Sequence, residues 1–124
     1  MKNEEKMQLS EDQEQELVIQ WRDIMANQYP ELRRLFHIAN GGSRHPAEAM
    51  KLRRMGVVPG VSDLFLPVAR HGYHGIWIEM KRKHGGRLSP DQKDWIEGMR
   101  EEGYKAERAD GADEAIAILE EYLK

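Results

Sequence analysis

The chain has 124 residues, 40% of them hydrophobic and 33% charged, and this length suits a single domain. The apolar content is sufficient for a core, which excludes a wholly disordered chain. Cysteine is absent, so disulfides, thiol catalysis and cysteine-ligated zinc are excluded. No apolar stretch approaches the roughly 18 residues of a membrane span, and the first residues are polar and acidic rather than a signal peptide. These features predict a cytoplasmic protein with no membrane partner.

Charge is distributed unevenly along the chain. The formal net charge is −3, but residues 33–93 hold twelve Lys and Arg against four Asp and Glu, a local balance of +8. The two flanks together carry −11. A basic centre between acidic ends is typical of a face that contacts nucleic-acid phosphates, although a solvated surface with chance clustering has the same composition.

Hydrophobic periodicity and capping residues predict the elements in chain order. Residues 1–9 are expected to form a flexible tail, and residues 10–124 a single domain. Ser10 and Gln13 form a capping-box pattern at the start of a helix over residues 10–28. A short strand over 35–39 and a loop lead to a second helix over 46–55, which begins at Pro46.

In the second half of the chain, turn residues and apolar patterns predict a hairpin followed by a helix, a strand and a helix. The expected ranges are 63–68 and 75–81 for the hairpin strands, 90–103 for the helix capped by Ser89, 104–108 for the strand and 112–123 for the last helix. The resulting order is α-β-α-β-β-α-β-α. It predicts an α/β fold in which helices flank one mixed sheet.

Three charged residues on the predicted hairpin indicate a catalytic site. Glu79 and Lys81 are two apart on one strand, so their side chains share a face, while Asp63 begins the neighbouring strand. Convergent carboxylates suit Mg²⁺ or Mn²⁺, and the backbone carbonyl of Met80 is a candidate additional oxygen ligand. A charged strand end at this spacing is also common on solvated edges, but apolar residues flank these positions and predict central strands.

Several motifs in series carry a family resemblance. They are Asn40-Gly41-Gly42, Lys51 with Gly56, Gly60-Val61-Ser62-Asp63-Leu64, Glu79-Met80-Lys81-Arg82, Ser89-Pro90-Asp91-Gln92 and Gly103-Tyr104. In this order they resemble the VRR-NUC domain, the virus-type replication-repair branch of the PD-(D/E)xK nucleases. The resemblance extends over nearly the whole chain from Ser10. One departure is Ser62 where the family usually has proline, a residue that shapes the turn and binds no metal.

The resemblance implies a restriction-endonuclease-like fold and a set of site residues. It implies that Asp63 and Glu79 bind the metal, that Lys81 is the catalytic lysine and that Gln92 assists. It also implies an acidic ligand on the first helix, for which Glu11 is preferred over Glu14 because Gln15 follows it by four residues, as in the family pattern. Both acids also suit the positive end of a helix dipole without any metal.

DNA is the expected partner. The candidate phosphate contacts are basic or polar residues around the predicted site, namely Asn40, Ser43, Arg44, Lys51, Arg53, Arg54, Arg82, Lys83 and Arg87. Stand-alone relatives resemble enzymes that resolve four-way (Holliday) junctions as homodimers, which implies a structure-selective endonuclease with two symmetric sites. The alternatives are a nuclease for flaps, ends or plain duplex, and a non-catalytic DNA-binding module of the same fold.

Overall fold

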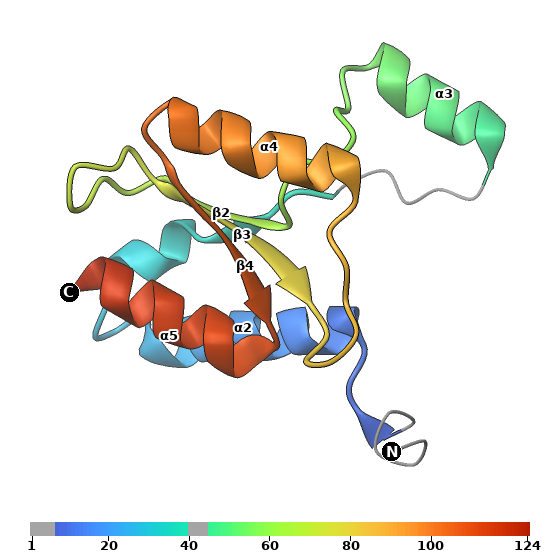
Figure 1. The fold of residues 1–124 in the computed structure, drawn as a ribbon. Coiled ribbons are helices and arrows are strands. Elements are labelled where there is room, and N and C mark those ends of the chain that lie inside the picture. Colours follow the sequence, from blue (N-terminus) through green and yellow to red (C-terminus); the bar gives the residue numbers. More distant parts are fainter. Residues whose placement is uncertain (1–6, 40–44) are drawn as a thin grey trace.

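The computed structural model describes residues 7–39 and 45–124, and its elements follow the predicted order (Figure 1). The helices are α2 (Glu11–Met25), α3 (Pro46–Arg54), α4 (Pro90–Glu101) and α5 (Ala112–Leu123), with a 3₁₀ helix η1 at Pro30–Arg34. The strands are β1 (Phe36–His37), β2 (Leu64–Leu66), β3 (Ile76–Lys81) and β4 (Lys105–Asp110). The α/β fold predicted from the sequence is therefore confirmed.

The four strands form one mixed sheet in the order β1-β2-β3-β4. The hairpin prediction is confirmed, because β2 and β3 are antiparallel with Leu64 opposite Ile78. Strand β4 runs parallel to β3 and places Arg108 opposite Glu79. β3 is therefore a central strand, with both of its neighbours hydrogen-bonded to it.

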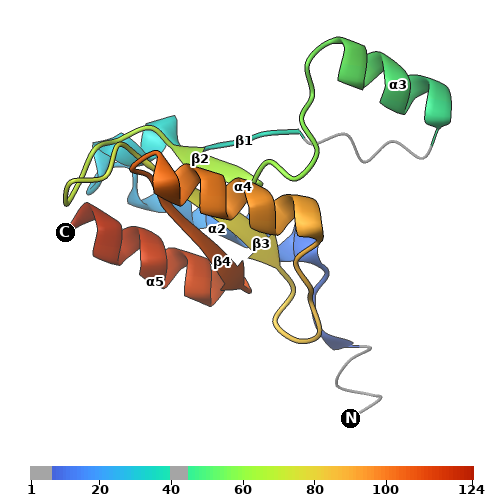
Figure 2. The ribbon, with the colours of Figure 1, turned by 45° about the horizontal axis from the view of Figure 1, so that its top comes forward.

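Helices cover both faces of the sheet (Figure 1 and Figure 2). Ile76, Ile78 and Met80 of β3 belong to the buried core that includes α2 and α5 residues. Because strand side chains alternate, the odd-numbered residues of β3 point to the α4 side, and the ring centroids of Trp77 and Trp95 are 5.2 Å apart there. Glu79 and Lys81 follow Trp77 on this second face.

The last three helices end within two residues of their predicted ends, but α2 ends at Met25, three residues early, and β2 is limited to Leu64–Leu66 of the predicted 63–68. The first strand is also shorter than predicted. Ser10 caps α2 in a complete capping box, and α5 has the predicted bounds. The predicted strand over 35–39 is wrong in extent: Leu35 ends η1, a helix that no sequence pattern predicted, and only Phe36 and His37 pair with β2. Strand β4 continues two residues beyond its predicted end because it pairs along the full length of β3.

Helix α3 projects away from the rest of the molecule (Figure 1 and Figure 2). None of its residues is buried, and three basic residues occupy its last turn. We call the segment from residue 45 to residue 61 the arm. Within the described part of the chain, no helix is long and apolar enough to cross a membrane.

Candidate active site

Three carboxylates from separate elements meet at the end of the central strand. Asp63 immediately precedes β2, Glu79 lies on β3, and Glu11 belongs to the first turn of α2. One carboxylate oxygen from each of the three lies within 4.8 Å of the others. Asp63 is held in place because the backbone N–H of Met80 donates a hydrogen bond of 2.8 Å to its Oδ2. The structure thus brings together the three acids selected from the sequence.

Lys81 and Gln92 complete this cluster from the same face of the sheet. The Lys81 side chain is nearly buried, and its Nζ lies 3.6 Å from Glu11 Oε1 and 3.7 Å from Glu79 Oε2. It donates a hydrogen bond of 3.1 Å to Gln92 Oε1. The Gln92 amide in turn donates to Glu79 Oε2 at 3.3 Å. Gln92 therefore connects the lysine to the buried carboxylate and fixes their relative positions.

The same glutamine also forms the beginning of α4. Its Oε1 accepts a second hydrogen bond, from the Ser89 backbone N–H at 2.9 Å, and Ser89 Oγ accepts from the Gln92 N–H, which completes a capping box. The orientation of the Gln92 amide is thereby set by the helix start. A local sequence signal for a helix cap consequently places a side chain in the site.

Burial dominates the electrostatics of Glu79, of which only 1% is exposed. This burial raises the pKa of Glu79 to about 9, and the neighbouring Asp63 carboxyl contributes to the rise. Partial burial also raises the pKa of Glu11, although the nearby Lys81 opposes this effect. Glu79 Oε1 is buried and has no hydrogen-bond partner among the described residues.

An all-oxygen donor set with a buried, unpartnered carboxylate oxygen fits a hard divalent cation. Within residues 7–39 and 45–124, the three acids have one paired ammonium group, that of Lys81, so the carboxylates outnumber the cations of the cluster. The N–H and C=O of one strand residue point to the same side. The Met80 carbonyl therefore lies on the side of Asp63, which its N–H contacts. Its role as a metal ligand stays a prediction.

The choice between Glu11 and Glu14 follows from their positions on α2. Glu14 is 1% exposed and accepts a hydrogen bond of 2.9 Å from the N–H of Ala112, the first residue of α5. Gly111, the residue before α5, has no side chain with which to cap the helix. Glu14 thus acts as a tertiary cap for α5, and Glu11 occupies the carboxylate cluster. The sequence contained no signal for this capping contact.

A basic loop lies against the predicted catalytic lysine. Gly86 approaches Lys81 so closely that an added Cβ would lie 2.9 Å from the Lys81 Cβ. The predicted phosphate contacts of this loop are all exposed, namely Arg82, Lys83 and Arg87. Glycine at position 86 therefore allows the loop backbone to pack over the site while its cations face solvent.

The remaining predicted DNA contacts belong to the arm and to the segment before it. Lys51, Arg53 and Arg54 are exposed in the last turn of α3. Asn40, Ser43 and Arg44 lie outside the described residues. His37 was not predicted as a site residue, yet its Nδ1 is 2.7 Å from the backbone oxygen of Asp63. No motif in the sequence could have indicated this contact, which depends on the pairing of β1 with β2.

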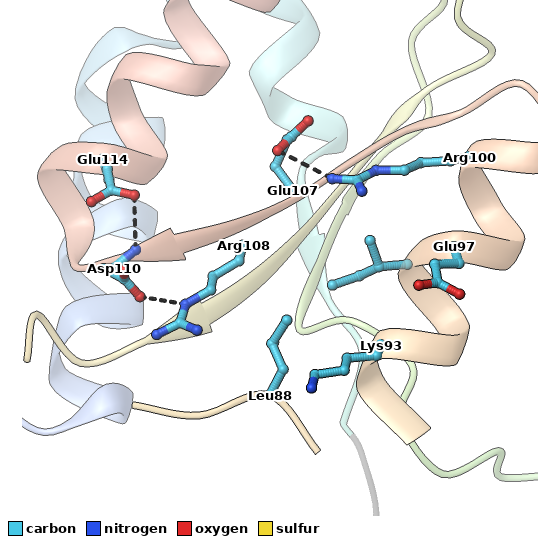
Figure 3. A pocket seen from close by; sticks show the side chains of 9 residues that line it. Leu88, Lys93, Glu97, Arg100, Glu107, Arg108, Asp110 and Glu114 are labelled. Atoms are coloured by element: carbon cyan, nitrogen blue, oxygen red, sulfur yellow. Dashed lines mark hydrogen bonds and ion pairs between the residues drawn. The ribbon is translucent and has the colours of Figure 1, made fainter. Parts of the chain in front are cut away.

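A separate groove of about 240 Å³ borders the edge strand β4 (Figure 3). Four of its charged side chains form two ion pairs: Arg108 lies 2.7 Å from Asp110, and Arg100 lies 3.4 Å from Glu107 (Figure 3). Arg100 Nε also donates to the Ala106 carbonyl at 3.0 Å. The contact with Ala106 covers part of the open strand edge, as is common for edge strands. None of the residues that line the groove belongs to the carboxylate cluster, so the two sites are distinct.

Comparison with known proteins agrees with the geometry of the cluster. The family model of the VRR-NUC domain matches residues 5–113. The chain belongs to the VRR-NUC family. A solved structure described as a VRR_NUC domain protein is 34% identical, with a TM-score of 0.79 over 93% of this chain and 88% of that chain. No curated protein matches the sequence. The family resemblance expected from the motifs is therefore confirmed, and the VRR-NUC domain implies a nuclease acting on nucleic acid.

Proposed function

We propose that this VRR-NUC protein is a Mg²⁺- or Mn²⁺-dependent DNA endonuclease that cuts branched DNA, with four-way junctions as the preferred substrate. The observation that carries the proposal is the meeting of Glu11, Asp63 and Glu79 beside Lys81. A module that only bound DNA would gain nothing from three carboxylates placed where phosphates approach, because they repel the backbone. Clustered acids beside a lysine instead suit phosphodiester hydrolysis.

Each member of the cluster has a defined task in this proposal. Glu11, Asp63 and Glu79 would hold the cation, which when bound polarises the phosphodiester and lowers the pKa of a coordinated water. Lys81 is oriented by Gln92 and lies beside the carboxylate cluster. Its ammonium group stabilises the negative charge that develops on the phosphate oxygens.

The proposed enzyme acts as a homodimer, because paired cuts across a junction require two sites related by two-fold symmetry. The outward face of α2 supports this arrangement. Leu17 and Ile24 are two helical turns apart on that helix and are 40% and 75% exposed. An exposed apolar stripe on a long helix is a surface that a second copy can bury. We further propose that residues 10–124 of each chain form a single domain.

The test is cleavage of a substrate panel that comprises a four-way junction, a flap, a linear duplex and a single strand. We expect Mg²⁺ or Mn²⁺ to support cleavage of the junction first, and EDTA to abolish it. Lys81→Ala should lower the cleavage rate by about 10²-fold or more, since removal of one transition-state contact has that effect. Lys124→Ala removes an exposed lysine at the far end of α5 and serves as the matched control.

The panel separates this proposal from its competitors. Cleavage of the flap, the linear duplex or the single strand as fast as the four-way junction would indicate a nuclease without junction preference. Binding without cleavage in either metal would indicate a DNA-binding module of the same fold. Undiminished cleavage by a folded Lys81→Ala variant would remove the lysine from the mechanism.

A further inference from the structure

The base of the arm contains an apolar groove that the proposed chemistry does not use. It has a volume of about 290 Å³ and is lined by Ile38, Ala39, Met55, Gly56, Val57, Val58 and Val61. Met55 and Val58 are 71% and 50% exposed. Apolar side chains so open to water, gathered at one groove, are typical of a surface that covers a ligand.

This groove is fixed next to the carboxylate cluster. The chain that leaves for the arm and the chain that returns are joined where the Ile38 N–H donates a hydrogen bond of 2.9 Å to the backbone oxygen of Asp63. On the returning side, Gly60 is buried with a φ of +90°, and an added Cβ would lie 2.4 Å from the Asp91 backbone. Asp91 immediately precedes Gln92. The groove therefore begins beside two residues of the site and has a rigid base.

The charges around the groove indicate what kind of ligand it accepts. Lys51, Arg53 and Arg54 occupy the turn of α3 that leads directly into Met55, and all three are exposed. A nucleotide has two parts that fit this arrangement: its phosphate is attracted to the cations, and its base presents an apolar face to the groove.

We propose that the groove receives one unstacked nucleobase of the DNA held at the active site. The inference rests on the proposed function, in that DNA is the substrate. Extruding a base from a continuous duplex breaks its pairing and its stacking on both sides, and the cost is least where pairing or stacking is already interrupted. A branch point interrupts the run of a single duplex, so a base is extruded more easily there. The groove therefore favours branched over continuous DNA and supplies a structural basis for substrate selection.

The test uses the full chain with Lys81→Ala, which keeps the DNA intact in Mg²⁺. The probe is 2-aminopurine, whose fluorescence rises on unstacking, placed at the branch point of a four-way junction or in a duplex of equal length. Met55→Ser and Val58→Ser change the groove. Met50→Ser is the matched control, because Met50 lies on α3, is 60% exposed and does not line the groove.

We expect the parent protein to raise the fluorescence of the junction probe and to leave the duplex probe unchanged. Because Met55 and Val58 would lose apolar surface that the base covers, the Met55→Ser, Val58→Ser double variant should bind the junction about tenfold more weakly or worse. Its affinity for the duplex should change less than about twofold, and Met50→Ser should resemble the parent.

Three results would overturn the inference: no fluorescence change with the parent protein, equal loss of junction and duplex affinity, or an altered oligomeric state of the double variant in light scattering. Cleavage of the junction by the wild-type protein, which retains Lys81, is measured separately. Junction cleavage without a probe signal refutes the groove alone, and a probe signal without cleavage refutes the nuclease proposal alone.

Discussion

Replacing Glu79 with glutamine should stabilise the protein when no metal is present. Glu79 is almost fully buried and faces Asp63 and Glu11, and Lys81 at 3.7 Å is the one cation paired with it among the described residues. Its pKa is about 9 in the fold, against 4.5 for the ordinary carboxyl. Glutamine has nearly the same shape and carries no charge, so the variant avoids the cost of charging or protonating this site.

The sign and size of the effect follow from proton linkage. A carboxyl whose pKa is raised by folding contributes its full stability below about pH 4.5, and this contribution is lost as the pH rises towards 9. Between these two values, each rise of one pH unit lowers the free energy of unfolding of the wild type by about 1.4 kcal/mol. At pH 7 the wild type is therefore about 3 kcal/mol less stable than a protein with a permanently neutral side chain at this position. The stability advantage of Glu79→Gln should therefore grow from about 1 kcal/mol at pH 5 to about 3 kcal/mol at pH 7.

Urea denaturation in EDTA at pH 5, 6, 7 and 8 measures this difference. Glu101→Gln is the control, because it makes the same substitution at an exposed position of α4. Adding Mg²⁺ should reverse the order, since binding to the folded state alone stabilises the wild type and the variant lacks one ligand. A variant that is less stable than wild type in EDTA at pH 8, or a difference that does not depend on pH, would refute the account of Glu79.

Three further outcomes test other parts of the structure. Glu14→Ala should lower the free energy of unfolding by about 1–3 kcal/mol because the first N–H of α5 loses its acceptor. Glu14→Gln keeps an acceptor and should retain much of this stability, so equal losses in both variants would contradict the capping role. Arg82→Ala with Lys83→Ala should reduce the slope of log affinity against log salt by about 1.8 on duplex DNA, whereas Lys124→Ala should leave it unchanged. Light scattering should report twice the mass of one chain, and Ile24→Asp should yield monomers; a monomeric wild type that still makes paired cuts would defeat the dimer.

The order of elements and the proximity of Asp63, Glu79 and Lys81 could be predicted from local patterns of residues, whereas Glu11 and Gln92 came from the family resemblance. Capping residues and apolar periodicity are local signals, so Ser10, Ser89 and the bounds of α5 could be located without tertiary information. The alternation of strand side chains placed Glu79 and Lys81 on one face for the same reason. Their contacts with Gln92 confirm that arrangement.

Tertiary structure decided the points at which distant segments meet. Glu11 and Glu14 are both acids in the first turn of α2, and only packing against α5 assigns Glu14 to the Ala112 N–H and leaves Glu11 beside Lys81. The first strand is shorter than its apolar residues predicted because its length depends on partners in β2. Residue pattern fixes local conformation, whereas burial and pairing across the chain fix which side chains share a site, because these free energies arise only when the elements pack.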